Sequence, residues 1–382
     1  MNKIHVDVED RQLTKDGEEL CGDKVEVVRD AHSVTVVLAD GLGSGVKANI
    51  LSTLTAKIAA TMRANGAPID EVISTIIQTL PTCKVRQLAY STLSLLEIDE
   101  DGSAYLVEFD NPPTIFLNHR GVELERIPRE IAGKTVRESQ FTVEPGDFIA
   151  LISDGVVHAG VGSVLNLGWQ WEHVVEYLER KIKETHAIRV VHDLVEVCET
   201  LYQSHPGDDA TVIGIGIRHP VPVCLFTGPP KDPADDPKVC EKLMSFEGKK
   251  VISGGTATNI ISKLTGKKAK MESYENEDVP PAAIMEGIDL VTEGIITLSK
   301  TVDLMREAIN RGLVVDGKDG AQRLARLLLE DCTELKVLLG QGINPAHLNP
   351  QLPVRLGPKV QVVGELVELF QKIGRKVEVE RF

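Results

Sequence analysis

Hydrophobic residues in the first 218 positions follow the spacing of strands in some segments and the spacing of helices in others. Apolar or alternating runs predict strands over 3–8, 24–40, 90–98, 104–109, 114–117, 148–153 and 210–217. We expect a short link at 31–33 to split the run 24–40 into a hairpin, and the strands between 90 and 117 to form an antiparallel meander. Apolar residues three and four positions apart predict helices over 44–66, 69–80, 169–183 and 187–204. This pattern indicates two antiparallel sheets stacked face to face with helices outside.

The remaining positions alternate more regularly between the two spacings. Short apolar runs predict strands over 223–227, 250–253, 335–339 and 377–380, and helical spacing recurs over 236–246, 257–264, 298–310, 321–332 and 360–373. Strands that alternate with helices are typical of an α/β domain with a parallel sheet. Pro220 and Pro222 separate this part from the first, so the sequence predicts one domain over 1–218 and a second over 219–382.

The composition is that of an ordinary globular protein. The chain has 382 residues, 42% of them hydrophobic, which is enough to fill a core in each of two domains. The first ten residues are charged and no apolar run approaches the length of a membrane span, so we expect a soluble, cytoplasmic protein with no membrane partner. The six cysteines are scattered and form no CxxC pair, which indicates neither a zinc site nor a disulfide framework.

The net charge of −15 is unevenly divided along the chain. Residues 1–218 contain 34 acidic and 20 basic side chains, whereas residues 219–382 contain 23 and 22. An acidic surplus in the first domain opposes binding to nucleic acid or to an anionic membrane. A cluster of carboxylate ligands accounts for part of this surplus, and a solvated acidic surface for the rest.

Four aspartates stand at the end of an apolar run or in a turn flanked by glycine: Asp23, Asp40, Asp154 and Asp208. Asp-Gly is a common turn dipeptide, so each position taken alone is more typical of a hairpin. If the fold gathers all four in a poorly hydrated cleft, their repulsion must be relieved by protonation or by cations. Oxygen ligands of this kind suit Mg²⁺ or Mn²⁺. Gly41 follows Asp40 directly, so its carbonyl group can approach a metal without a Cβ in the way.

The order and flanks of these motifs resemble the metal-dependent protein phosphatase superfamily (PPM, the phosphatase 2C-like fold), and within it the bacterial stage II sporulation protein E family. The resemblance covers residues 1–218 and depends on the complete ordered set rather than on any single piece. Its segments are 21–23 (CGD), 36–45 (VVLADGLGSG), 109–113 (FDNPP), 145–147 (PGD), 151–156 (LISDGV) and 208–212 (DDATV).

The resemblance implies an αββα sandwich, that is, two antiparallel sheets flanked by helices, and a serine/threonine protein phosphatase activity. It also implies two Mn²⁺ or Mg²⁺ ions. Asp40 would bridge the ions, Asp23 and the Gly41 carbonyl would complete one site, and Asp154 with Asp208 would complete the other. A water activated by both ions would attack the phosphorus in line, so that Asp40 and Asp154 are catalytic through that water. The implied substrate is a phosphorylated bacterial signalling protein, such as an anti-sigma factor antagonist in a partner-switching pathway, and a homodimer is also implied.

Two positions beside these motifs have alternative interpretations. Asp209 competes with Asp208 as a ligand; Asp208 matches the first acidic position of the family motif, and Asp209 is expected to cap or orient. His158 follows Asp154 by four residues and is a candidate general acid for the leaving serine oxygen. A lone histidine in a surface loop usually has no such role, so His158 is left outside the catalytic set.

Residues 219–382 resemble no family that we recognise. Two of their strand-to-helix junctions, 226–231 and 253–258, combine glycine with small hydroxyl residues, and free N–H groups at a helix start favour an anion. The second junction predicts an anion site at Gly254, Gly255 and Thr256, although glycine at such a turn is also common for packing alone. A second hypothesis for the whole chain follows: a catalytically weak phosphatase fold that serves as a signalling or scaffold module, with the C-terminal domain as its ligand sensor.

Overall fold

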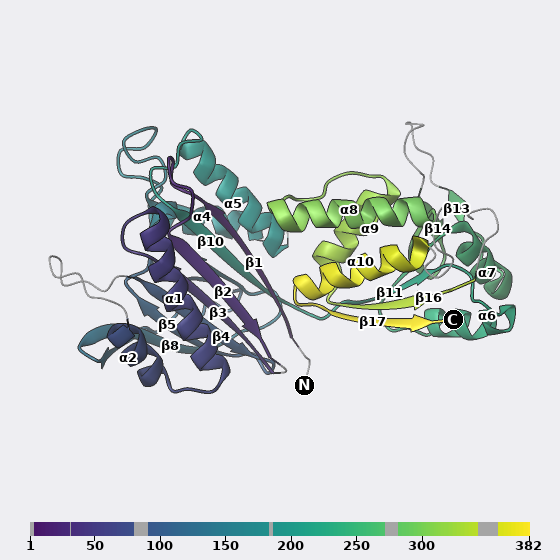
Figure 1. The fold of residues 1–382 in the computed structure, drawn as a ribbon, viewed down its shortest axis with the longest axis horizontal. Coiled ribbons are helices and arrows are strands. Elements are labelled where there is room, and N and C mark those ends of the chain that lie inside the picture. The colour runs from purple at the N-terminus through teal and green to yellow at the C-terminus, as the bar shows by residue number, and fades with distance from the viewer. Residues whose placement is uncertain (1–3, 31, 80–90, 183–185, 272–281, 343–357) are drawn as a thin grey trace. The chain divides into compact units, whose positions relative to one another are not determined.

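The chain folds into two compact units, which we describe separately. A computed structural model describes residues 4–30, 32–79, 91–182, 186–271, 282–342 and 358–382. Unit 1 comprises Met1–His219 and unit 2 comprises Pro220–Phe382 (Figure 1). None of the helices in these described ranges is long and apolar enough to span a membrane.

Unit 1 contains two antiparallel sheets. One has the strand order β1-β10-β9-β6 and the other the order β2-β3-β4-β5-β8-β7. The strands of the first sheet are β1 (His5–Leu13), β10 (Ala210–Arg218), β9 (Phe148–Ile152) and β6 (Ile115–Leu117). Those of the second are β2 (Asp23–Arg29), β3 (Ser33–Asp40), β4 (Leu93–Asp99), β5 (Ser103–Phe109), β8 (Lys134–Thr142) and β7 (Ile127–Ile131).

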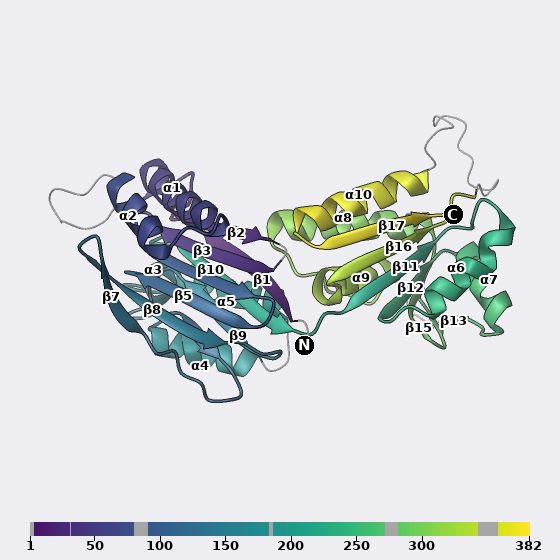
Figure 2. The same cartoon turned by 90° about the horizontal axis from the view of Figure 1, so that it is seen from below.

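The two sheets stack face to face, and helices cover their outer faces. The helices are α1 (Gly45–Ala64), α2 (Ile69–Thr79), α3 (Asp154–Val157), α4 (Trp171–Lys181) and α5 (Ala187–Leu201). Because successive side chains of a strand point to opposite faces, Val36 of β3 packs with Leu151 of β9 between the sheets, whereas Val37 packs with Ala56 of α1 outside. Figure 2 shows α1 and α2 on one side of the paired sheets and α4 and α5 on the other.

The predicted fold class of this part of the chain is confirmed, but one strand was assigned to the wrong sheet. Residues 115–117 do not continue the meander after β5; they form β6, which pairs with β9 in the opposite sheet. The neighbour of β5 on the side away from β4 is β8, which was not predicted. A three-residue apolar run shows that a strand is partly buried, but it does not determine which sheet the strand joins.

Unit 2 contains a mostly parallel sheet with the strand order β13-β14-β15-β12-β11-β16-β17. The five strands β15, β12, β11, β16 and β17 pair in parallel, and β13 and β14 add an antiparallel edge. Their bounds are β11 (Pro222–Thr227), β12 (Lys249–Ser253), β13 (Lys270–Met271), β14 (Ala283–Met285), β15 (Ile288–Thr292), β16 (Glu334–Leu339) and β17 (Lys376–Arg381). The predicted parallel sheet is confirmed, although β13, β14 and β15 were not predicted.

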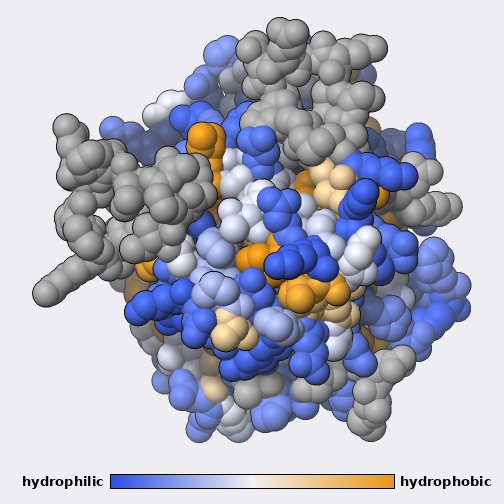
Figure 3. All heavy atoms as spheres, turned by 90° about the vertical axis from the view of Figure 1, so that its right-hand side faces the viewer, coloured by the Kyte–Doolittle hydropathy of each residue, from blue (hydrophilic) through white to orange (hydrophobic). Residues whose placement is uncertain are grey.

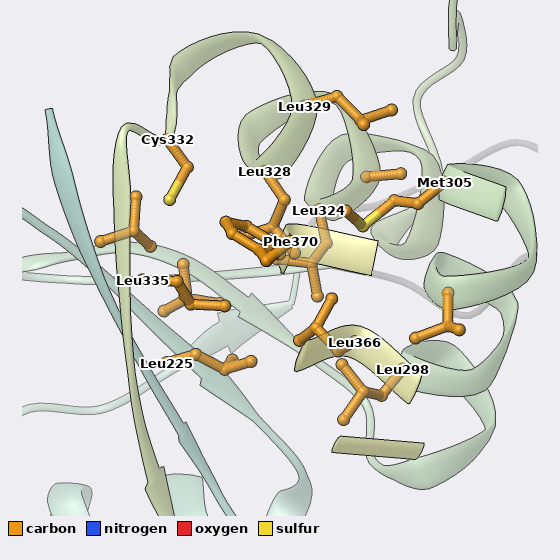
Figure 4. Packing of buried hydrophobic residues seen from close by; sticks show 14 of the residues in the cluster. Leu225, Leu298, Met305, Leu324, Leu328, Leu329, Cys332, Leu335, Leu366 and Phe370 are labelled. Atoms are coloured by element: carbon orange, nitrogen blue, oxygen red, sulfur yellow. The ribbon is translucent and has the colours of Figure 1, made fainter. Parts of the chain in front are cut away.

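Helices cover both faces of this sheet. Those on one face are α6 (Asp236–Met244) and α7 (Gly255–Thr265); those on the other are α8 (Ile295–Arg311), α9 (Gly320–Arg326) and α10 (Pro358–Lys372). Leu225 of β11 and Leu335 of β16 meet Leu324, Leu366 and Phe370 from the second set of helices (Figure 4). All five side chains are fully buried, so they form a core that belongs to this unit alone. The helix predicted over 321–332 is divided, because a π-helical turn at 327–331 follows α9.

Candidate metal centre

Asp23 and Asp40 lie directly opposite each other at the ends of two paired strands. Asp23 is the first residue of β2 and Asp40 is the last of β3, and the antiparallel register pairs them. Directly opposed residues in such a pair have Cβ atoms about 5 Å apart. Asp23 is only 2% exposed, and its Oδ1 atom has no hydrogen-bond partner among the described residues. A buried carboxylate oxygen without a partner is costly unless a cation or a proton satisfies it.

Gly41 brings this strand end into close contact with α1. A Cβ at Gly41 would collide with the backbone of Ala48, one turn into the helix. The Gly41 N–H donates to the carbonyl of Gly22 at 3.2 Å, which ties the turn after β3 to the turn before β2. Glycine at position 41 is therefore needed for packing, and the two aspartates are held on a rigid pair of strand ends.

Asp154 and Asp208 come from the other sheet. Asp154 follows β9 at the start of the short helix α3, and Asp208 precedes β10, the neighbour of β9. The Tyr202 hydroxyl donates to the Gly155 carbonyl at 2.6 Å and fixes the turn that carries Asp154. The side chains of Asp154 and Asp208 are 46% and 40% exposed, so this side of the cluster is open to solvent.

The electrostatic effects show that these carboxyl groups share one environment. Burial raises the pKa of Asp40 to about 9, with further contributions from the negative charges of Asp23, Asp154 and Asp208. Burial also raises the pKa of Asp23 to about 7, against the hydrogen bond from Thr211, which favours its charged form. The structure thus brings together the four aspartates that the sequence singled out. Without cations, the cluster takes up protons near neutral pH.

Asp209 occupies a different position from Asp208. It is 4% exposed, and its Oδ1 atom accepts the backbone N–H of Lys15 at 3.0 Å. Asp208 is half-exposed and its carboxylate lies 3.8 Å from the Lys15 ammonium. Asp208 Oδ1 also accepts a backbone N–H, that of Asp209 at 3.1 Å, so the two carboxylates differ in exposure: the buried one is suited to hold a loop in place, and the exposed one is suited to bind a ligand. This geometry favours the assignment of Asp208, rather than Asp209, as the ligand.

Hydrogen bonds from neighbouring residues orient the cluster. The Thr211 hydroxyl donates to Asp23 Oδ2 at 2.6 Å, and the Thr211 N–H donates to the Ser153 hydroxyl at 2.8 Å. At the end of β3, the Asp40 N–H donates to Thr92 Oγ1 at 3.0 Å, and the Thr92 hydroxyl donates to Asn111 Oδ1 at 2.5 Å. Thr92 was not singled out by the sequence, since its role depends on a cross-strand contact that no local motif reveals.

His158 is closer to the cluster than the sequence suggested. One donor atom from each of Asp154, His158 and Asp208 lies within 4.8 Å of the others. His158 Nδ1 is 3.9 Å from Asp154 Oδ2, as expected for residues four positions apart on a helical turn. The i,i+4 spacing from Asp154 was the available signal, but the contact with Asp208 depends on the fold.

Residues 30–218 match the family model described as Stage II sporulation protein E (SpoIIE). This part of the chain belongs to the stage II sporulation protein E family. Asp40, Asp154 and Asp208 lie inside the matched residues, and Asp23 lies before them. No curated protein sequence matches the chain.

Several solved structures are similar to part of the chain. One is the PP2C phosphatase domain, with a fragment of the regulatory domain, of SpoIIE from Bacillus subtilis: 21% identity, TM-score 0.46, 57% of this chain and 65% of that chain covered. Another contains the RsbU and RsbW domains of Rv1364c from Mycobacterium tuberculosis: 16% identity, TM-score 0.46, 63% and 67% covered. A third is RsbX in complex with magnesium: 21% identity, TM-score 0.41, 56% and 96% covered. The chain therefore spans slightly less than two thirds of the first of these structures.

The predicted anion site lies in unit 2 and is unrelated to the aspartates. Gly254 immediately precedes α7, and Gly255 and Thr256 form the first turn of that helix. All three residues line a cavity at the carboxyl ends of the parallel strands. The other junction predicted from sequence, 226–231, contributes only Gly228 to the described residues that line this cavity.

Proposed function

We propose that unit 1 is a metal-dependent serine/threonine protein phosphatase that acts on a phosphorylated bacterial signalling protein, such as an anti-sigma factor antagonist. The observation that carries this proposal is the convergence of Asp23, Asp40, Asp154 and Asp208 at the ends of strands from both sheets. Membership of the SpoIIE family for residues 30–218 supports the same reaction class.

The residues at the site fit two divalent cations that prefer oxygen ligands, Mn²⁺ or Mg²⁺. The fit is indicated by the buried, partnerless Oδ1 of Asp23 and by the raised pKa of Asp40, because both call for a nearby positive charge. We assign Asp23, Asp40 and the Gly41 carbonyl to one ion and Asp40, Asp154 and Asp208 to the other. Such ions would supply an activated water and neutralise charge on the phosphoryl group.

The chain's own residues position this chemistry. Asp40 is the last residue of a largely buried strand, which limits the movement of its backbone and side chain. Thr211 holds Asp23 by a hydrogen bond, and Gly155 allows the Asp154 turn to pack against the backbone of Asp209, where a Cβ would collide. The open side at Asp154 and Asp208 gives a phosphoserine side chain access to the ligands.

We also propose that His158 contributes a nitrogen donor beside Asp154 and Asp208. Imidazole binds Mn²⁺ and other transition metals better than it binds Mg²⁺, which strongly prefers oxygen. A nitrogen donor on one side of the cluster would therefore shift the preference of that site towards Mn²⁺.

The decisive experiment is phosphate release from a phosphoserine peptide with and without Mn²⁺, for the full chain and for Asp40→Asn. We expect turnover that requires Mn²⁺ and is abolished by the substitution. Asp101→Asn is the matched control, because Asp101 lies in the exposed β4–β5 turn at the far end of the sheet. If the wild-type chain binds Mn²⁺ but releases no phosphate from several phosphopeptides, the alternative function as a catalytically weak signalling or scaffold module is favoured.

A further inference from the structure

Unit 2 contains a cavity of about 480 Å³ at the carboxyl ends of its parallel strands. This volume lies within the range of small-molecule sites in proteins. The strands β12 and β15 end there, and the cavity lies between the segments that follow them, beginning at Gly254 and Gly294. In open α/β sheets, ligands bind outside the carboxyl ends of the strands, so the cavity has the expected position for a binding site.

The neighbouring crevice between β11 and β16, where the order of the strands reverses, is closed by the backbone itself. The Gly340 N–H donates to the Thr227 carbonyl at 2.9 Å, and a Cβ at Gly228 would come within 2.7 Å of the Gly340 carbonyl oxygen. A ligand therefore has space beside β12 and β15 but not at the position where dinucleotides usually bind.

Two helices begin at the wall of this cavity. Gly254 precedes α7 and Gly294 precedes α8, and a Cβ on Gly254 would lie 3.6 Å from the Cα atom of Gly294. No side chain among the described residues caps either helix, so the N–H groups of both first turns face the same space. Each helix N-terminus carries roughly half a positive charge, and both favour an anion.

A lysine from a third helix completes the positive wall. Lys359 of α10 lines the cavity, and its Nζ atom lies 2.7 Å from the position of a Cβ on Gly228. Burial lowers the pKa of Lys359, and no acceptor or carboxylate pairs with its ammonium in the described part of the chain. A partly buried cation without a counter-charge is stabilised by an anionic ligand.

The remaining wall is mixed: Asn259 and the exposed Glu293 line it together with apolar residues. Ala269, Ala283 and Ile296 line it, and Ile296 is 76% exposed although it stands in the first turn of α8. Figure 3 shows the molecule from the right-hand side of Figure 1. Pale and hydrophobic residues lie near the middle of this face, and hydrophilic residues lie around them. Such a surface suits an organic group next to the charged part of a ligand.

We propose that unit 2 binds a phosphate-bearing small molecule in this cavity. The phosphate lies between the first turns of α7 and α8 and the Lys359 ammonium, and the organic part packs against Ala283 and Ile296. Two helix ends and one lysine supply roughly two positive charges against the one negative charge of Glu293, and their several N–H donors suit the three acceptor oxygens of a phosphate ester. Unit 2 is then the ligand-binding part of the chain, whatever the activity of unit 1.

The test is a set of calorimetric titrations of the full chain with inorganic phosphate, AMP, ATP and adenosine. EDTA is present throughout, so that metal-bound phosphate in unit 1 does not contribute and the result is independent of the proposed phosphatase activity. We expect AMP or ATP to bind more tightly than inorganic phosphate, and adenosine to bind at least about tenfold more weakly than AMP, because charge-assisted hydrogen bonds are lost. Adenosine binding as tightly as AMP, or no binding of any phosphate compound, would overturn the proposal.

Two variants locate the site. Lys359→Met should weaken phosphate-ester binding by about tenfold or more, whereas Lys372→Met, near the other end of α10 and bonded to Asn310, should not.

Ile296→Glu places a negative charge in the first turn of α8 without disturbing the core, and it should also weaken phosphate-ester binding relative to the wild type. Leu264→Glu is its control at the far end of α7, where the side chain is 44% exposed. Equal affinity in Lys359→Met and Lys372→Met, or in both glutamate variants, contradicts the assignment.

Discussion

The two candidate sites of this chain have opposite charge, because one sheet presents acidic side chains at its strand ends and the other presents the starts of helices. In unit 1 the ends of antiparallel strands carry the side chains of Asp23, Asp40, Asp154 and Asp208, so the site is a concentration of negative charge. In unit 2 a helix follows each of β12 and β15, and the site is built from helix N-termini and Lys359. The charge of the first site depends on side chains, and much of the charge of the second comes from the backbone. A single substitution should therefore disable the first site, while the second should lose affinity in steps.

The largest expected effect on activity comes from replacing Asp40 in the first site by a neutral residue. We expect Asp40→Asn to lower Mn²⁺-dependent hydrolysis of a phosphoserine peptide by about a thousandfold or more, because the residue is assigned to both ions. Steady-state turnover measures the effect, with Asp101→Asn as the reference. A loss smaller than about tenfold in Asp40→Asn would show that Asp40 is not a shared ligand.

The same substitution should have the opposite effect on the stability of the metal-free protein. At neutral pH the metal-free folded chain must take up a proton at buried Asp40, whose pKa is about 9, and asparagine removes this cost, so Asp40→Asn should increase the free energy of unfolding in EDTA by about 1–2 kcal/mol. Thermal unfolding in EDTA and in Mn²⁺ provides the measurement. Mn²⁺ should stabilise the wild-type chain more than the variant. A variant that is less stable than the wild type in EDTA would argue against repulsion within the cluster.

His158 provides a finer distinction within unit 1. His158→Gln should weaken Mn²⁺ binding by about tenfold and Mg²⁺ binding by less, because only the nitrogen donor is removed. Competition titrations of the two metals report the ratio of their affinities. His205→Gln is a suitable control, since His205 is exposed and pairs with Asp16 rather than with the cluster. An unchanged ratio in His158→Gln would exclude His158 from the metal site.

The last prediction concerns the dependence of stability on pH in the absence of metal, a gradual change rather than the loss of a group. The folded-state pKa of Asp40, about 9, lies above its unfolded value near 4, so between these values the folded chain binds a proton that the unfolded chain does not. The free energy of unfolding should therefore fall as pH rises from 5 to 9, by at most about 1.4 kcal/mol per pH unit for this proton. Urea unfolding in EDTA at several pH values measures the slope. Saturating Mn²⁺ should flatten it, and a slope of the opposite sign would contradict the assignment.

Much of the fold could be predicted from local pattern. The run that ends at Asp40 and the apolar strand before Asp154 are long enough to fix their structure, and their turns follow from glycine. The partners of short strands could not be predicted, because Ile115–Leu117 gives no indication of its sheet. Strand β15 was not predicted because it is a short run between Gly287 and Gly294, and a short segment bounded by glycines equally suits a loop.

Some residues of the candidate sites could likewise be predicted from local pattern, and others could not. Asp40 and Asp154 stand out in the sequence because each combines a strand end with a following glycine. His158 and Lys359 do not stand out, since their importance depends on neighbours that are distant in the chain: Asp208 for the first, and the starts of α7 and α8 for the second. Residues whose role comes from tertiary contacts need the fold before they can be recognised.

The central claim is that the aspartate cluster of unit 1 binds two divalent cations. Calorimetric titration of the full chain with Mn²⁺ tests it most directly, together with the same titration of Asp40→Asn. The account predicts two bound ions per chain in the wild type and a loss of binding at both sites in the variant. Absence of Mn²⁺ binding in the wild type, or identical binding in the two proteins, would contradict it.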